Sequence, residues 1–344
     1  MIKKQLMAIL LSALLILTAS GCKSNISDTS KSGEMQVLCA AFAEYDWTRA
    51  ILGENPGNIQ LSLLNESGMD MHSYQPSVAD MVKIADADLV IFTGGESEFW
   101  IEDALISSGS EAANHLCLME IFLHHHDLSD RYTLDCEEEE GHDHDHGDEE
   151  EEGHDHDHEG HLHTTDEHLW LSPKMAPTFV GEIAEALSEL DPANRDYYAQ
   201  NLRNYITRIS TLDFQFEEAV RLAYEKGSVT ILVADRYPLK YLLEDYGIKH
   251  IAAFPGCSAE TEASFETILS LSEAFDHLNL SAVAILKKSK TDLAQTVIKN
   301  SLRQDAEIIV FDSMQSVTAK DIKAGATWLS VMEENLEALT QALK

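Results

Sequence analysis

The chain has 344 residues, of which 24 are Lys or Arg and 60 are Asp or Glu, so its formal net charge is −36. Such an acidic chain repels nucleic acids and anionic lipid surfaces and attracts cations. Its length allows two domains, and 44% hydrophobic residues are enough to build buried cores.

The first residues are typical of an export signal. Lys3 and Lys4 precede an apolar run, 6–17, that is too short to span a bilayer comfortably. The run ends in Ala-Ser-Gly-Cys, as in bacterial lipoproteins. We therefore expect a lipoprotein signal peptide at 1–21, a lipidated Cys22 and a polar tether at 22–34, which together anchor the protein outside a membrane. An ordinary signal peptide is the alternative.

Residues 35–190 alternate short apolar runs with amphipathic segments. This alternation predicts parallel strands connected by helices, which is an α/β lobe. The predicted strands are 36–42, 59–64, 89–95 and 115–120, and the predicted helices are 76–88, about 98–107 and about 174–190.

An acidic, His-rich insert at about 124–165 interrupts this lobe. Residues 137–163 contain fourteen carboxylates and eight imidazoles, and the sequence EEEEGHDHDH at 137–146 occurs again at 149–158. The insert lacks the apolar residues needed to form a core, so we expect it to be disordered. Alternating His and Asp predict weak auxiliary metal sites, whereas a merely solubilising loop is the alternative. The histidines are His142, His144, His146, His154, His156, His158, His161 and His163.

A long helix is predicted at 191–227, with Asp191 as its N-cap, Pro192 in its first turn and Gly227 at its end. The α/β pattern then resumes in a second lobe at 228–344. Its predicted strands are 229–235, 248–254, 281–286 and 307–312, and its last helix is about 326–343. The sequence therefore predicts two lobes with mainly parallel sheets, joined by a single long helix.

Four residues near the ends of predicted strands could bind a metal ion. Ligands of α/β lobes bind beyond the carboxyl ends of the strands. His72 follows the second strand, His168 lies in DEHLWLSP, and Asp235 and Asp312 end two strands of the second lobe. Neutral imidazoles and ionised carboxylates suit a first-row divalent cation. The alternatives are surface histidines and aspartates that only bind turn amides.

Three segments carry a family resemblance, namely GMDMHSYQPSVADMVKIADADLVIFTGGESEFW, DEHLWLSP and ADRYPLKYLLEDYGIKHIAAFPGCSAETEASFETI. With them the chain resembles the zinc/manganese solute-binding lipoproteins of ABC uptake transporters over about 36–343. The resemblance implies two α/β lobes, a long connecting helix and a metal site in the cleft between the lobes. A His-rich loop before the second His motif is a feature of the zinc members, so Zn²⁺ is expected and Mn²⁺ is the alternative.

The resemblance also implies a ligand set. His72 and His168 match the two family histidines, and Asp312 matches the late carboxylate. At the third position, alignment on Tyr241 points to Arg236, but a guanidinium cannot bind a cation. Asp235 is therefore the predicted third ligand.

These features predict a lipid-anchored protein on the extracytoplasmic face of the cell membrane. It would capture zinc as a monomer and deliver it to an ABC permease and its ATPase. The sequence has no HExxH or Gly-x-Ser-x-Gly motif, and a four-ligand site leaves no open position for water, so no enzyme activity is expected. A manganese-binding member of the family and a metal-buffering surface adhesin are the alternatives.

The remaining cysteines form no CxxC pair, which argues against a thiolate zinc finger. Export permits disulfides, but the sequence does not indicate which cysteines pair. They are Cys39, Cys117, Cys136 and Cys257.

Overall fold

The computed structural model describes residues 33–108, 114–125, 165–227, 229–254 and 263–344. The predicted signal peptide, Cys22, the His-rich segment 137–163, Cys136 and Cys257 lie outside these residues. The chain divides into a unit of residues 1–34 and a unit of residues 35–344. All the helices and strands given below belong to the second unit.

The first lobe is built on a four-stranded sheet in the order β2-β1-β3-β4. Its strands pair in parallel, and β1 and β3 are apolar and largely buried, as expected for a sheet covered on both faces. The strands are β1 (Met35–Cys39), β2 (Ile59–Leu63), β3 (Leu89–Phe92) and β4 (Asn114–Cys117). The helices are α2 (Phe42–Leu52), α3 (Val78–Asp86), α4 (Phe99–Ser107), α5 (Leu118–His124) and α7 (Ala176–Leu190), with short 3₁₀ turns at Met71–Ser73 and Leu169–Leu171.

The second lobe repeats this plan with the order β6-β5-β7-β8, again in parallel pairs. The strands are β5 (Thr230–Val233), β6 (Lys249–Ala252), β7 (Ala282–Leu286) and β8 (Glu307–Phe311). The helices are α9 (Lys240–Glu244), α10 (Phe265–His277), α11 (Asp292–Asn300), α12 (Ala319–Lys323) and α13 (Trp328–Ala342). The predicted α/β class with two mainly parallel sheets is therefore confirmed.

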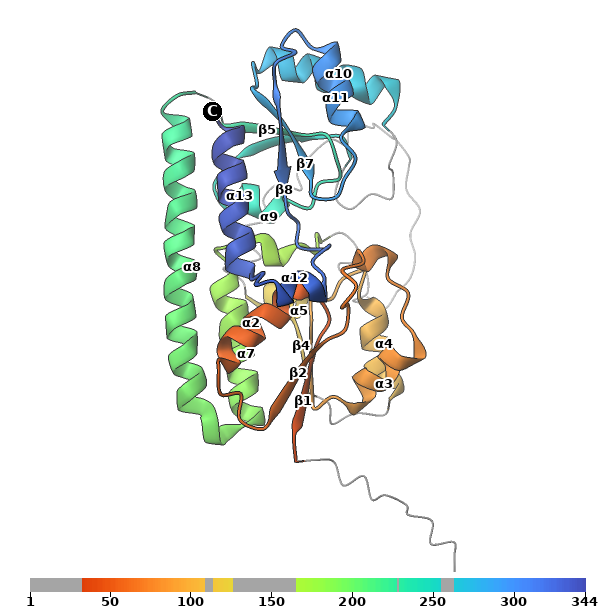
Figure 1. Ribbon diagram of the computed structural model, residues 1–344, viewed down its shortest axis with the longest axis vertical. Helices are drawn as coiled ribbons and strands as arrows, with labels where there is room; N and C mark the ends of the chain where they lie inside the picture. The colour runs from red at the N-terminus through yellow and green to blue at the C-terminus, as the bar shows by residue number, and fades with distance from the viewer. Residues whose placement is uncertain (1–32, 109–113, 126–164, 228, 255–262) are drawn as a thin grey trace, which may run out of the picture. The chain divides into compact units, whose positions relative to one another are not determined.

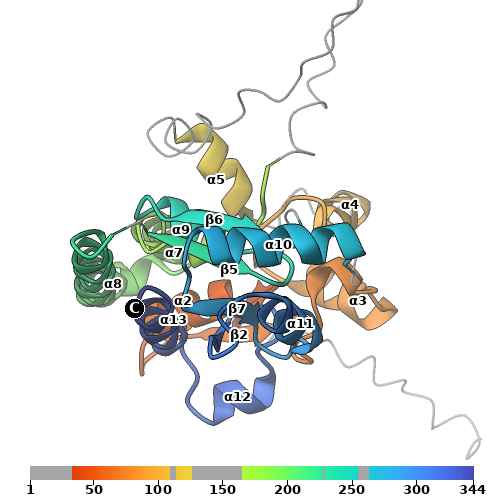
Figure 2. The same cartoon turned by 90° about the horizontal axis from the view of Figure 1, so that it is seen from above.

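One long helix, α8 (Arg195–Tyr224), links the lobes. Its 30 residues span about 45 Å. It packs against α7 and α2 of the first lobe and against α13, and Figures 1 and 2 both show α8 beside α13. The helix starts later than predicted, because a 3₁₀ turn at Pro192–Asn194 precedes it and Asn194 is its N-cap. Asp191 instead accepts a hydrogen bond from the Tyr198 hydroxyl at 2.8 Å.

The end of the chain crosses back onto the first lobe. The Ala319 amide donates to the Glu66 carbonyl at 2.9 Å, and the Trp328 amide donates to the Asp46 carboxylate at 2.7 Å. The Trp328 indole also donates to the Trp170 carbonyl at 2.8 Å, and its ring lies 5.7 Å from that of Trp47. The start of α13 therefore belongs to the core of the first lobe, while the helix also contacts β7 and β8 of the second.

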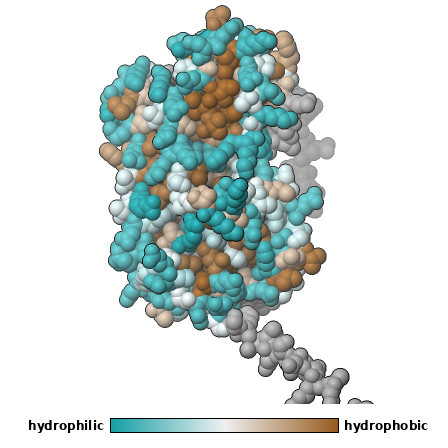
Figure 3. Space-filling view, in the orientation of Figure 1, coloured by the Kyte–Doolittle hydropathy of each residue, from teal (hydrophilic) through white to brown (hydrophobic). Residues whose placement is uncertain are grey.

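The second sheet carries an apolar surface at one edge. Figure 3 shows an apolar area over β8, at one edge of the second sheet, where Val310 is 48% exposed. Among the described residues, no helix is both apolar and long enough to span a membrane. Cys39 and Cys117 are free thiols in the first core, and burial raises the pKa of Cys117 to about 12.

A pair of buried carboxyl groups lies behind the end of β3. Glu44 is 0% exposed, and within the described residues its Oε2 atom has no hydrogen-bond partner. Its Oε1 atom accepts from the Thr93 hydroxyl, and Glu98 Oε2 accepts from the amides of Thr93 and Gly94 at 2.7 and 2.9 Å. Burial raises the pKa of Glu44, and burial together with the charge of Glu44 raises the pKa of Glu98 well above its usual range. The pair therefore keeps a proton to a higher pH than exposed glutamates do.

We expect this pair to make the folded protein less stable as the pH rises above about 4.5, the ordinary glutamate value. A carboxyl group with a raised pKa in the folded state keeps a proton that the unfolded chain has lost. The free energy of unfolding should therefore fall by about 1.4 kcal/mol per pH unit for each such proton, until the pH passes the raised pKa. Glu44→Gln should reduce this slope in urea unfolding measured from pH 4 to pH 8. The exposed Glu54→Gln change is the control, and an unchanged slope in Glu44→Gln would show that Glu44 does not hold the proton.

Candidate metal site

His72 lies in the middle of the short 3₁₀ turn that follows β2. The turn is fixed from both sides, because Met71 is buried and the Asp70 carboxylate accepts from the His72 amide at 3.1 Å. Gly68, at a φ of +61°, brings this loop close to the second lobe, since a Cβ atom there would lie 2.7 Å from the Val317 carbonyl oxygen. The local backbone therefore presents His72 at the boundary between the lobes.

His168 precedes the second 3₁₀ turn, Leu169–Leu171. Leu169 and Leu171 are both 0% exposed and hold this segment in the core. The Asp166 carboxylate lies 2.9 Å from both the amide and the Nδ1 atom of His168, which fixes the orientation of the ring. Although burial opposes it, the neighbouring His168 ring holds the pKa of Asp166 below its usual range. With Nδ1 engaged in this way, His168 would bind a metal through Nε2, an arrangement common for ligating histidines.

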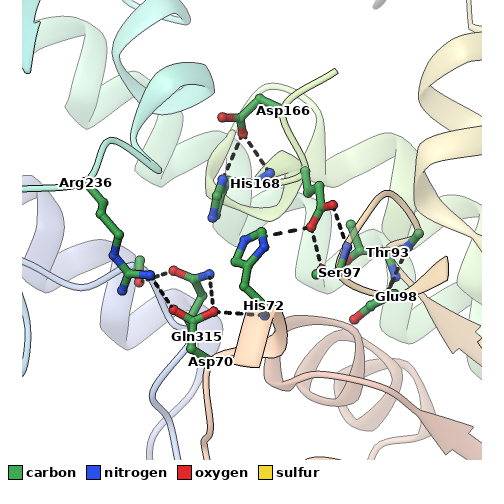
Figure 4. A network of polar contacts seen from close by, with 12 residues as sticks. Asp70, His72, Thr93, Ser97, Glu98, Asp166, His168, Arg236 and Gln315 are labelled. Atoms are coloured by element: carbon green, nitrogen blue, oxygen red, sulfur yellow. Dashed lines mark hydrogen bonds and ion pairs between the residues drawn. The ribbon is translucent and has the colours of Figure 1, made fainter. Parts of the chain in front are cut away.

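The structure places the two histidines side by side, with ring centroids 6.1 Å apart (Figure 4). His168 is only 1% exposed, whereas the His72 side chain is 26% exposed, so solvent reaches the pair from the His72 side. Glu167 is a second carboxylate beside them, with Oε2 4.0 Å from His72 Nε2.

The two predicted aspartates of the second lobe are held within that lobe. Asp235 accepts from the amide of Arg236 at 2.8 Å and from the amide of Leu286 at 3.0 Å, so it joins the ends of β5 and β7. Asp312 accepts from the amide of Met314 at 2.8 Å and from Lys287 Nζ at 2.7 Å. It lines a pocket of about 370 Å³ on the second lobe. Both carboxylates would have to leave or share these partners to bind a cation beside the histidines.

Arg236 instead reaches across to the first lobe. Its Nη1 atom lies 2.8 Å from Asp70 Oδ2, and Gln315 Nε2 donates to Asp70 Oδ1 at 3.3 Å (Figure 4). Asp70 is therefore a bridge between the loop that carries His72 and the second lobe. Arg236 was not predicted to belong to the site, because a guanidinium cannot bind a metal, although alignment on Tyr241 pointed to it.

Three further carboxylates near the histidines were not predicted from the sequence. Asp70, Asp166 and Glu167 all lie within two residues of a predicted histidine ligand, which was the available signal. Two imidazoles with carboxylates around them suit a divalent cation. In the part of the chain that the structure describes, however, no three His, Cys, Asp or Glu side chains already converge as a metal-holding group. A metal ion could be bound by three or more side chains here only if side chains near the pair moved.

Comparison with known sequences identifies a family and relatives of this chain. The family model described as zinc-uptake complex component A, periplasmic (ZnuA) matches residues 37–342. The zinc-binding lipoprotein AdcA of Streptococcus pneumoniae is 28% identical over 334 residues, which are 97% of this chain and 60% of that protein. This chain thus spans about 60% of the length of that relative. The high-affinity zinc uptake system protein ZnuA of Bacillus subtilis is 26% identical over 330 residues, covering 96% of this chain and 94% of that protein.

Solved structures show the same fold. The metal-dependent lipoprotein YcdH of Bacillus subtilis superposes with a TM-score of 0.67 at 21% identity, covering 90% of this chain and all of that one. The Zn(II)-bound ZnuA-like domain of Streptococcus pneumoniae AdcA superposes with a TM-score of 0.65 at 23% identity, covering 90% of this chain and 99% of that one. Together with the family match over residues 37–342, the two-lobed fold and the paired histidines, this leads to one conclusion: the chain belongs to the ZnuA family of zinc-uptake complex components.

Proposed function

We propose that this protein captures zinc outside the cytoplasm and delivers it to an ABC permease. The observation that carries the proposal is the juxtaposition of His72 and His168, whose rings lie 6.1 Å apart although the residues come from distant segments of the chain. Family membership supports the same function, since the matching model describes a component of a zinc-uptake complex.

The chemistry of the site favours zinc as the cargo. Imidazole nitrogens bind zinc well, and His168 already has a carboxylate on its second nitrogen, as zinc-bound histidines usually do. We retain Asp235 and Asp312 as proposed ligands from the second lobe, each of which would have to rearrange. Manganese is the competing metal, because it prefers carboxylate oxygens.

We also propose where the protein acts and which partners it has. Lipidation at Cys22 would hold it on the outer face of the membrane as a monomer, within reach of the permease and its ATPase. Capture and release of an ion need no bond breaking, and four protein ligands would leave no open position for an activated water. We therefore infer that the protein is a carrier without enzyme activity.

The His-rich segment 137–163 has a proposed role as a collector of ions. Its eight histidines would bind several zinc ions weakly and hold them near the cleft when free zinc is scarce. The solubilising alternative attributes the segment to its fourteen acidic residues alone.

Zinc titration of the purified protein against a chelating dye tests the function. We expect one tight site and several weaker ones, and manganese should compete poorly for the tight site. Deleting residues 137–163 should remove the weak sites and leave the tight one. Weak sites alone in the intact protein, or tighter binding of manganese than of zinc, would contradict the proposal. Loss of the tight site on deletion would instead place one of its ligands in the segment.

A further inference from the structure

Besides Asp166, which contacts the His168 ring, Glu167 also has its carboxylate close to a ring of the histidine pair. Its Oε2 atom lies 4.0 Å from His72 Nε2, and it is adjacent in sequence to His168. The residue is 7% exposed, so its carboxylate is held at the buried end of the site. Asp166, the other neighbouring carboxylate, is already occupied in orienting the His168 ring.

The loop after β3 is built around this carboxylate. The Ser97 amide donates to Glu167 Oε1 at 2.8 Å, and the Ser97 hydroxyl donates to Oε2. Gly95 has a φ of +83°, and a Cβ atom there would lie 2.6 Å from Glu167 Cγ. Even one methyl group would therefore collide with the Glu167 side chain, which shows how closely the backbone approaches it.

The bonds to Ser97 leave the carboxylate able to bind a cation. Each carboxylate oxygen can accept at two positions, and Ser97 uses one position on each oxygen. Neighbouring ligand atoms around a tetrahedral zinc ion lie roughly 3.3 Å apart. The separation of 4.0 Å between Glu167 Oε2 and His72 Nε2 therefore needs to close by less than about 1 Å.

We propose that Glu167 is a direct ligand of the zinc ion, together with His72 and His168. This inference rests on the proposed function and specifies its site. Three ligands would then come from the first lobe, and the second lobe would need to supply at most one carboxylate. Asp235 could keep both of its backbone partners at the ends of β5 and β7.

The test compares Glu167→Gln with Glu96→Gln, both in the protein lacking residues 137–163 so that only the cleft site is measured. The amide at 167 keeps the size of the side chain but binds zinc poorly. Glu96 is an exposed residue of the same loop, so its change removes the same charge without touching the site. Zinc itself is the probe, in competition with a chelating dye, and urea unfolding of the metal-free proteins checks that both variants fold.

We expect Glu167→Gln to weaken zinc binding by more than about 100-fold, because loss of an outer partner alone costs roughly 10- to 100-fold. Glu96→Gln should change the affinity less than about threefold, as an exposed, screened charge. Glu167→His, which exchanges one ligand for another, should recover most of the lost affinity. The visible absorption of the cobalt(II)-loaded protein should change in Glu167→Gln, because it reports the number and geometry of the ligands.

Two results would overturn the assignment while leaving the proposed function intact. One is tight zinc binding in Glu167→Gln. The other is weakened binding with an unchanged cobalt spectrum and no recovery in Glu167→His, which would make Glu167 a residue that only positions His72. Absence of a tight zinc site in the intact protein, with residues 137–163 present, would overturn the proposed function itself, and this inference with it.

Discussion

His72→Ala and His168→Ala are each expected to weaken zinc binding at the tight site by roughly 10²- to 10³-fold. Zinc sites with four protein ligands bind with about 10–16 kcal/mol, which divides into roughly 2.5–4 kcal/mol for each ligand. Every 1.4 kcal/mol is a factor of ten in affinity. The two variants should lose similar amounts, because each removes one imidazole from the same pair.

Both variants should be made in the protein lacking residues 137–163, so that weak sites do not hide the loss. His277→Ala is the control, because His277 is an exposed residue at the end of α10 in the second lobe. Competition with a chelating dye gives the dissociation constants. Unchanged tight binding in either variant would remove that histidine from the site, whereas equal losses in all three would indicate a nonspecific effect.

Trp328→Ala is expected to lower the free energy of unfolding by about 3–5 kcal/mol, the usual cost of removing a large buried aromatic side chain. Trp328 is 0% exposed and packs against Trp47. Its indole donates to the Trp170 carbonyl, which the substitution would leave buried without that donor. Because total stabilities are commonly only 5–15 kcal/mol, this one change should remove a large fraction of the stability.

Urea unfolding with a chelator present measures this effect without a contribution from bound metal. Trp328→Phe should lose less, since it keeps an aromatic ring beside Trp47 while losing the hydrogen bond. Phe265→Ala is the control, because Phe265 is 80% exposed, and its loss should cost less than about 0.5 kcal/mol. A loss below 1 kcal/mol in Trp328→Ala would show that the first lobe does not depend on the start of α13.

Most of the fold was predictable because parallel strands carry a strong local signal. Runs such as 282–286 are buried and uniformly apolar, so the predicted and observed strands agree within a few residues. The run 115–120 was predicted as one strand, but the strand ends at Cys117 and α5 begins at Leu118. A short apolar run does not distinguish a strand from a buried helix. The return of the chain end onto the first lobe depends on the Trp328 contacts, which link residues far apart in sequence.

The site was predictable only in part. His72 and His168 could be predicted as candidate ligands because each lies in a distinctive motif, and the structure brings their rings side by side. Asp235 accepts from the amide of its own neighbour Arg236, as the turn-amide alternative allowed, but its bond from the Leu286 amide of β7 could not be predicted, because these residues meet only in the folded sheet. The same holds for Arg236, whose contact with Asp70 joins residues 166 positions apart.

The ion pair between Asp70 and Arg236 also affects the total charge of the side chains beside the two histidines. Asp70, Asp166 and Glu167 each carry a formal negative charge beside the histidines, and Arg236 carries one positive charge. The guanidinium therefore offsets one of the three carboxylates and leaves a formal charge of −2 on these four side chains. A divalent ion would offset this charge more fully than a monovalent ion would. Arg236, which cannot bind a metal, would in this way limit the negative charge beside the histidines.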